Sequence, residues 1–276
     1  ADALDCKEPA CIVLDDLGMA TEATVKAALR FVQCGDIGDR KLPAHVGLVA
    51  LSNDVTHAAG VMGLMEPMKD RFHTIVHLEY CVADTVAYGM AKGWDVGVLA
   101  YLNNGSQTDG KTALPVFDWK PSRDLRRAGA TPRGYEYASD WLKMGCDDRA
   151  VIEGCIGPGH ATALLAFRAL MKDLPDLFSI FADPENAAVP ENPSARYLVA
   201  TAIASKMDGG NFGQAVRYLN RMPKMLRILA VRDCRRAEVE RTKLKIVKPD
   251  HRPLSTSRDY VTWTLSPDAK DLVGMS

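Results

Sequence analysis

The sequence predicts an α/β domain with a partial parallel sheet, followed by a domain built only of helices. Three short apolar stretches alternate with segments of helical spacing, which gives the order strand, helix, strand, helix, strand. After residue 78 no strand-like stretch recurs, and amphipathic segments bounded by Pro and Gly follow. We therefore expect the α/β part at residues 1–82, the helical part at 83–254 and a C-terminal tail at 255–276.

The first strand is expected at residues 11–14 (CIVL), where uninterrupted apolar residues are typical of a strand covered on both faces. Asp15 and Asp16 follow it directly. Open α/β sheets bind their ligands at the carboxyl ends of such strands. In P-loop nucleotide hydrolases the first acid of such a pair holds the Mg²⁺ hydration shell, and the second polarises the attacking water. The alternative interpretation is a strand end whose aspartates only cap the next turn.

The remaining elements of the α/β part follow from spacing and turn residues. They are a helix with an apolar stripe from Val25 to Val32, a tight hairpin or loop at 34–45, a second buried strand at 46–51, a helix with a stripe from Val61 to Phe72, and a third strand at 73–78. The second strand ends in Ser52-Asn53-Asp54. Asn53 at this position is either a turn former or a side chain that positions water.

The helical part is divided by Pro and Gly, and several prolines fall where a first-turn proline is tolerated. Helices are expected at residues 84–102, 132–145, 147–156, 160–174, 193–207, 212–221 and 223–236. Residues 183–193 read as a Pro-rich connector.

Composition excludes some functions and indicates a compartment. The formal net charge of −1 gives no overall field for nucleic acid or a membrane surface, and no apolar run approaches the ~20 residues of a spanning helix. Seven cysteines without a C-x-x-C pair are typical of reduced thiols, so we expect a cytoplasmic protein. The chain begins with Ala1 and enters its first strand at once, which leads us to expect a missing upstream segment.

Several motifs together resemble one family. Residues 13–18 (VLDDLG), 37–43 (IGDRKLP), 63–72 (GLMEPMKDRF), 130–139 (ATPRGYEYAS) and 181–195 (FADPENAAVPENPSA) are similar to the MoxR-like branch of the AAA+ ATPases of bacteria and phages. The resemblance covers about residues 11–236, and its specificity lies in the combination and order of the motifs. It implies the C-terminal half of an AAA+ core followed by a helical lid.

The resemblance implies a role for five residues. Asp15 would be the Walker B acid that holds Mg²⁺ through water, and Asp16 would stand at the catalytic base position, where the family usually has Glu. Asn53 would be sensor 1, Arg133 sensor 2, and Arg71 an arginine finger acting on a neighbouring subunit. ATP and Mg²⁺ are the implied cofactors, and a homo-oligomeric ring, commonly a hexamer, is the implied assembly. Taken singly, Arg71 also fits a helix C-terminal cation and Arg133 a surface charge.

Residues 105–112 (GSQTDGKT) match the phosphate-binding pattern G-x-x-x-x-G-K-[ST]. In that motif Lys111 and Thr112 would have to open a helix, but Pro115 follows within its first turns, where proline costs about 3 kcal/mol. We therefore interpret the stretch as a loop and keep a permuted P-loop GTPase as an alternative.

The P-loop of the family is then missing from the sequence. In the family's sheet the strand that feeds the P-loop lies between the second and third strands of this chain. Without it the third strand would lack a hydrogen-bonding neighbour. We expect a truncated form of a longer ATPase that, as it stands, binds ATP weakly or not at all.

Two further patterns have ordinary interpretations. His73, His77 and nearby Asp70 are a weak candidate metal site, because strand histidines are usually solvated or hydrogen-bonded. Between residues 217 and 252 basic residues outnumber acidic ones, which is typical of a solvated helix face. Docking of an acidic partner or nucleic acid is the alternative, and sparse aromatic residues make nucleic acid an unfavoured partner.

Three functions remain. The first is an AAA+ ATPase that remodels a protein client, which by resemblance is often linked to a von Willebrand factor A domain protein. The second is a non-hydrolysing helical scaffold or interaction protein, which the missing P-loop and the short acid at Asp16 favour. The third is the permuted GTPase that uses Lys111 and Thr112.

Overall fold

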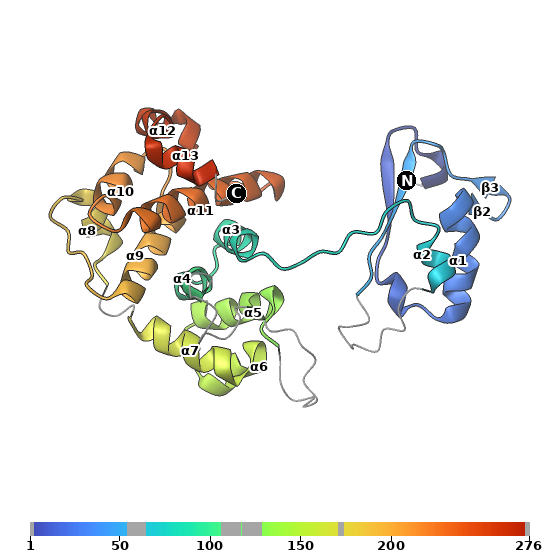
Figure 1. Ribbon diagram of the computed structural model, residues 1–276, viewed down its shortest axis with the longest axis horizontal. Helices are drawn as coiled ribbons and strands as arrows, with labels where there is room; N and C mark the ends of the chain where they lie inside the picture. The colour runs from blue at the N-terminus through green and yellow to red at the C-terminus, as the bar shows by residue number, and fades with distance from the viewer. Residues whose placement is uncertain (1–2, 54–64, 106–116, 118–128, 171–173, 274–276) are drawn as a thin grey trace. The chain divides into compact units, whose positions relative to one another are not determined.

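The computed structural model describes residues 3–53, 65–105, 117, 129–170 and 174–273. The chain forms two compact units, Ala1–Glu79 (unit 1) and Tyr80–Ser276 (unit 2) (Figure 1). Unit 1 combines helices with a small parallel sheet, and the described elements of unit 2 are helical. The expected class of a small parallel α/β part followed by helices is therefore observed at this coarse level, and the molecule is mostly helical.

Unit 1 is built around a two-stranded parallel sheet. Its elements are β1 (Ala10–Leu14), α1 (Glu22–Cys34), β2 (Asp36–Ile37), β3 (Arg40–Lys41), β4 (Val46–Ala50) and α2 (Glu66–Lys69), with short 3₁₀ turns at Ala3–Asp5 and Leu17–Met19. β1 pairs with β4 in register from Ala10 opposite Val46 to Leu14 opposite Ala50. β2 and β3 form the expected hairpin, which is antiparallel.

The ends of α1 follow from its sequence. Thr21 is the N-cap and its side chain accepts a hydrogen bond from the backbone N–H of Thr24. Gly35 ends the helix with a φ of 71°, a left-handed conformation that glycine adopts without steric cost. The apolar stripe of α1 then packs on one face of the sheet, where Val25 joins Leu17 and Met68 in a small core.

Within the described part of unit 1, one face of this sheet is covered and the other is exposed. Burial alternates along both strands, as expected for a half-buried sheet. Leu14 and Ala50 face the small core, whereas Val13 and Val49 on the other face remain 55% and 45% exposed. The expectation that these strands are covered on both faces is thus wrong for the described residues.

The predicted third strand is not formed. Residues 73–80 have no regular secondary structure, and Ile75, Val76 and Leu78 are exposed. A strand needs a partner for its N–H and C=O groups, and within the described residues no strand lies beside this segment. The prediction of a strand from these residues is therefore wrong for the described structure, because β propensity without a pairing neighbour does not make a strand.

Unit 2 contains eleven described α-helices. They are α3 (Val82–Lys92), α4 (Val96–Gly105), α5 (Pro132–Lys143), α6 (Arg149–Ile156), α7 (Pro158–Ala169), α8 (Leu177–Ala182), α9 (Pro193–Lys206), α10 (Phe212–Leu219), α11 (Lys224–Lys243), α12 (Arg258–Thr264) and α13 (Pro267–Val273). Pro132, Pro158 and Pro193 each open a helix, as their fixed φ favours.

The single helix expected at residues 84–102 is two helices. Gly93 takes a left-handed φ of 73° after α3, and Asp95 then begins α4 by accepting hydrogen bonds from the N–H groups of Gly97 and Val98. Gly89 lets the chain turn tightly, because a Cβ there would lie 2.6 Å from the Trp94 ring. The two helices therefore pack against each other rather than continuing one axis.

The core of unit 2 runs through most of its helices. Tyr135, Tyr218 and Phe212 are among its largest fully buried side chains. Residues 255–276, expected as a tail, belong to this unit and form α12 and α13. These helices are attached in part by an edge-to-face contact between the rings of Phe212 and Tyr260, whose centroids lie 5.2 Å apart. In the part of the chain that the structure describes, no helix has the length and apolar character needed to cross a bilayer.

Candidate functional site

Asp15 and Asn53 follow the carboxyl ends of β1 and β4, which lie at the same end of the sheet. The backbone N–H of Leu51 donates to the carbonyl of Leu14 at 2.9 Å. The N–H of Leu17 then donates to the carbonyl of Leu51 at 3.0 Å. These two bonds continue the ladder past the strands, so the chain segments that carry the acid pair and the amide leave the sheet side by side.

Asp16 has a strained backbone. Its φ of 51° and ψ of 35° lie in the left-handed region, which costs a non-glycine residue about 1–2 kcal/mol. Its N–H donates to the Oδ1 of Asp15 at 3.1 Å, and its carbonyl accepts from Met19 at 2.8 Å. Strain of this kind concentrates at functional sites, although aspartate is also among the residues that tolerate it best.

The acid pair and the amide are open to solvent. Asp15, Asp16 and Asn53 are all exposed. Mg²⁺ is commonly bound by one or two carboxylates together with water and substrate phosphates, so the oxygen donors present fit that ion in kind. In the described residues no group of three or more His, Cys, Asp or Glu side chains is placed to hold a metal, and this includes His73, His77 and Asp70. Asp15 and Asp16 would therefore need phosphate oxygens to complete the coordination shell of Mg²⁺.

Arg71 lies in the same unit but is held by neighbours of its own chain. Its Nε donates to the Oε1 of Gln33 on α1 at 3.2 Å, and its Nη1 donates to the carbonyl of Pro67. The contact with Pro67 is the helix C-terminal interaction that a cation makes with free carbonyls. A role in a neighbouring subunit would require these bonds to break.

Arg133 belongs to unit 2 and stands in the first turn of α5. Thr131 caps this helix by accepting a hydrogen bond from the N–H of Gly134 at 3.0 Å. Gly134 is required beside Arg133, because a Cβ there would lie 2.5 Å from the carbonyl oxygen of Cys155. The side chain of Arg133 is exposed. The structure thus brings together Asp15, Asp16 and Asn53, with Arg71 in the same unit and Arg133 in the other.

Of the match to a phosphate-binding loop at 105–112, only Gly105 lies within the described residues. Its approach is described, however. Residues 98–102, which the permuted GTPase would need as a strand, lie within the helix α4. A P-loop joins a strand to a helix, so the structure contradicts that part of the alternative.

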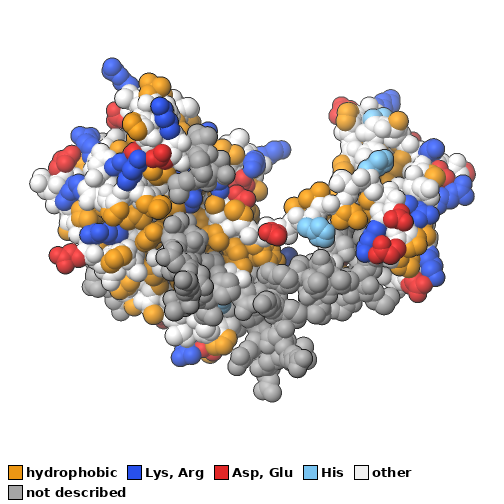
Figure 2. Space-filling model, in the orientation of Figure 1, with side chains coloured by type: hydrophobic (Ala, Val, Ile, Leu, Met, Phe, Trp, Pro, Cys, Tyr) orange, Lys and Arg blue, Asp and Glu red, His pale blue; other side chains and the backbone are white. Residues whose placement is uncertain are grey.

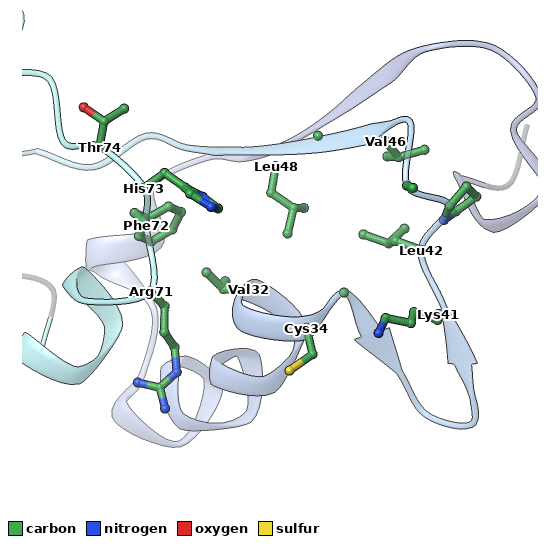
Figure 3. A pocket seen from close by; sticks show the side chains of 14 residues that line it. Val32, Cys34, Lys41, Leu42, Val46, Leu48, Arg71, Phe72, His73 and Thr74 are labelled. Carbon is green, nitrogen blue, oxygen red and sulfur yellow. The ribbon is translucent and has the colours of Figure 1, made fainter.

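A cavity of about 650 Å³ opens elsewhere in unit 1 (Figure 3). Its lining includes Val32 of α1, Leu48 of β4 and Phe72, whose side chains surround the open space. The cavity lies beside the amino-terminal half of β4, whereas Asn53 follows the carboxyl end of that strand. Asp15, Asp16 and Asn53 do not line the cavity. Figure 3 shows the guanidinium of Arg71 directed away from the space.

Sequence spacing could not reveal the polar groups buried in unit 2. The hydroxyls of Tyr101 and Tyr135 lie 3.3 and 3.2 Å from the Nδ1 of His160, and these residues come from α4, α5 and α7. Burial raises the pKa of both tyrosines. Another such group is Asp233, which is 1% exposed. No local motif marks either group, because their members meet only when distant helices pack.

Comparisons with known proteins gave no match to any family model, curated protein or solved structure.

Proposed function

We propose that unit 1 supplies the Walker B and sensor 1 half of a nucleotide site, and that the protein is an AAA+ ATPase of the MoxR-like type. Its activity would be remodelling of a protein client within a homo-oligomeric ring. The observation that carries the proposal is the parallel pairing of β1 and β4, because Asp15 directly follows β1 and Asn53 lies three residues beyond the carboxyl end of β4. This is where an α/β sheet binds nucleotide.

In this proposal each residue has one task. Asp15 binds Mg²⁺ through water, Asp16 orients and polarises the attacking water, and Asn53 positions that water against the γ-phosphate. Arg71 and Arg133 contribute guanidinium groups to the phosphates, Arg71 from the neighbouring subunit. The left-handed backbone at Asp16 supports a functional role, because backbone strain of this kind concentrates at functional sites.

The site also requires a phosphate-binding loop and the strand that leads into it. One edge of β4 is available for such a strand. In a strand, the backbone groups of successive residues point to alternate edges. The carbonyl of His45 and the N–H of Leu51 bond to β1, so the backbone groups of Leu48 and Ala50 point to the opposite edge. The cavity in Figure 3 is lined by Leu48 of β4 and also by His73 and Thr74, the first residues of the segment that was expected to form the third strand.

The decisive experiment measures ATP hydrolysis by the product of the complete gene, including any residues encoded before Ala1. Asp15→Asn should abolish Mg²⁺-dependent hydrolysis. Asp16→Asn should lower kcat by at least about 100-fold while leaving ATP binding intact, because it removes the base and keeps the size of the side chain. Asp39→Asn, an exposed aspartate in the β2–β3 turn, is the control and should behave as the unaltered protein. Unaltered hydrolysis in both Asp15→Asn and Asp16→Asn would refute the proposal.

A helical scaffold without hydrolysis is the second candidate. The hydrogen bonds that tie Arg71 to Gln33 and Pro67 favour it, because they engage the proposed finger within its own unit. Titration of Mg-ATP into this chain should give weak or no binding under either function. Tight binding that Lys111→Ala removes would instead restore the permuted GTPase.

A further inference from the structure

The basic residues between 217 and 252 do not form one charged face. Several have acidic partners in the described structure: Arg227 pairs with Asp268, Lys224 with Asp268 and Asp271, Arg236 with Asp84, and Lys243 with Glu240. On the visible face of unit 2, Figure 2 shows basic and acidic side chains interspersed. Helix α5 offers a stronger candidate for an interaction surface, and that surface is apolar.

Helix α5 carries apolar side chains on two of its faces. Tyr135 and Leu142 are buried in the core of unit 2. Tyr137, Trp141 and Met144 lie outside that core and are 53%, 43% and 67% exposed. A surface helix normally turns a polar face to water, so these three side chains go beyond what the packing of unit 2 requires.

The three exposed side chains form one row, which we call the α5 stripe. They follow one another at intervals of four and three residues, which places them on a single face of the helix. Tyr, Trp and Met are enriched at the centres of protein interfaces, and Trp in particular is frequent among the residues that dominate binding energy. Single exposed apolar residues are ordinary, whereas a contiguous group indicates an interaction site.

The charges beside the α5 stripe are complementary to themselves under a two-fold rotation. Asp140 and Lys143 flank Trp141 along the helix, and the Nζ of Lys143 lies 3.2 Å from the Oδ1 of Asp140. Both side chains are half-exposed. When two α5 helices meet antiparallel about an axis at Trp141, Asp140 of each copy faces Lys143 of the other. A parallel pairing would instead set like charges opposite each other, which disfavours it.

The same antiparallel arrangement gives every member of the α5 stripe an apolar partner. Trp141 lies on the axis and meets its own copy, and aromatic pairs of this kind are favourable beyond the area that they bury. Tyr137 and Met144 lie at similar distances from Trp141 in opposite directions along the chain, so each faces the other across the contact. Sulfur–aromatic contacts are favourable as well.

We propose that the α5 stripe is the surface through which two copies of this chain associate, by antiparallel contact of their α5 helices. Because α5 has 12 residues and is therefore about 18 Å long, the interface is small and the dimer is weak, with a Kd of about 10–100 µM. The contact uses none of the five residues of the proposed nucleotide site. A ring is built from heterologous contacts, so this isologous contact is a separate interface.

The first test is sedimentation equilibrium of the whole chain over about 2–200 µM, where the mean mass should rise from monomer toward dimer. Trp141→Ala should weaken the association at least about 30-fold, the effect of losing a central aromatic residue. Phe178→Ala is the matched control, because Phe178 is an aromatic residue of α8 that is 81% exposed and lies outside the α5 stripe. The control should dimerise as the unaltered chain does.

The second test exchanges the flanking charges. Asp140→Lys and Lys143→Asp should each weaken the dimer about 3–10-fold, because each places like charges opposite each other. The double variant restores both pairs with their signs exchanged, so it should dimerise more tightly than either single variant. Both residues are half-exposed, so these variants keep the test valid if Trp141→Ala does not fold.

Three results would overturn the proposal. The first is a chain that remains monomeric at about 200 µM, which is well above the expected Kd. The second is a dimer whose Kd is the same in Trp141→Ala and the unaltered chain. The third is a double charge variant that associates no more tightly than the single variants, since the two helices would then not meet in the antiparallel arrangement.

Discussion

Asn103 of α4 donates a hydrogen bond of 2.7 Å to the Oδ2 of Asp233 of α11, a carboxylate that is 1% exposed. Arg232 donates to the other oxygen of Asp233 through Nε and Nη2, at 2.9 and 2.8 Å. This network joins two helices that lie far apart in the sequence. Because a buried carboxylate needs its partners, the network also fixes how α4 and α11 align.

We expect Asp233→Ala to lower the free energy of unfolding of unit 2 by about 3–5 kcal/mol, since it leaves Arg232 and Asn103 without their acceptor. All four tryptophans lie in unit 2, so urea unfolding followed by tryptophan fluorescence reports on this unit. Asp84→Ala is the control, because exposed Asp84 pairs with Arg236 of the same helix α11, and it should cost less than about 1 kcal/mol. Equal effects of the two substitutions would contradict the role of the buried network.

The same carboxylate should make stability depend on pH. Burial raises the pKa of Asp233, and this effect outweighs the lowering by Arg232 and Asn103. A raised pKa in the folded state means that stability is lost as pH rises from about 4, the ordinary aspartate value, through the folded-state pKa. Asp233→Asn removes this loss, so the variant should gain stability relative to the unaltered protein over that range. A difference in unfolding free energy that is constant with pH would contradict the raised pKa.

Two glycines of neighbouring helices should respond oppositely to alanine. Gly134→Ala should destabilise unit 2 by about 1–3 kcal/mol, because the new Cβ meets the backbone carbonyl of Cys155, which cannot move alone. Gly154→Ala in α6 should stabilise it by about 0.5–1 kcal/mol, since no atom lies within 4 Å and alanine favours the helix. Thermal unfolding monitored by fluorescence compares them, and a stabilising Gly134→Ala would show that α5 and α6 are not packed as described.

Lys245 occupies a position that favours glycine. Lys245→Gly should raise the stability of unit 2 by about 0.5–1 kcal/mol, because it relieves a left-handed backbone that costs lysine about 1–2 kcal/mol. Lys243→Gly, two residues earlier and still helical, should lower stability, because glycine disfavours the helix. The opposite signs in urea unfolding distinguish relief of backbone strain from loss of a lysine charge.

Cysteine reactivity should divide the chain's thiols by burial. Burial raises the pKa of Cys234 to about 12, so its thiolate is scarce at pH 8. Cys11, Cys34 and Cys81 are exposed and should react with N-ethylmaleimide within minutes, whereas Cys234 should react only after unfolding in urea. Mass spectrometry of the labelled peptides measures this order. Labelling of Cys234 as fast as Cys34 in the folded chain would show that α9 and α11 open readily.

Local chemistry made several elements predictable. The apolar run before Asp15 predicted β1, the apolar stripe from Val25 to Val32 predicted α1, and the proline at the start of α5 marked that helix. The parallel pairing of β1 and β4 could also be anticipated, because a helix between two strands favours a right-handed parallel connection. Asp15, Asp16 and Asn53 thus came to one edge of the sheet as expected, while their proposed roles await the hydrolysis measurements.

By itself the sequence indicated several of the helices, the first two strands and the polar residues that follow those strands, but it missed α8, α12 and α13. These features depend on neighbours within a few residues. Only the tertiary structure decided that residues 73–78 form no strand and that Asn103 meets Asp233. Strand pairing and the burial of a charged group both depend on partners distant in the chain, and no local pattern encodes those partners.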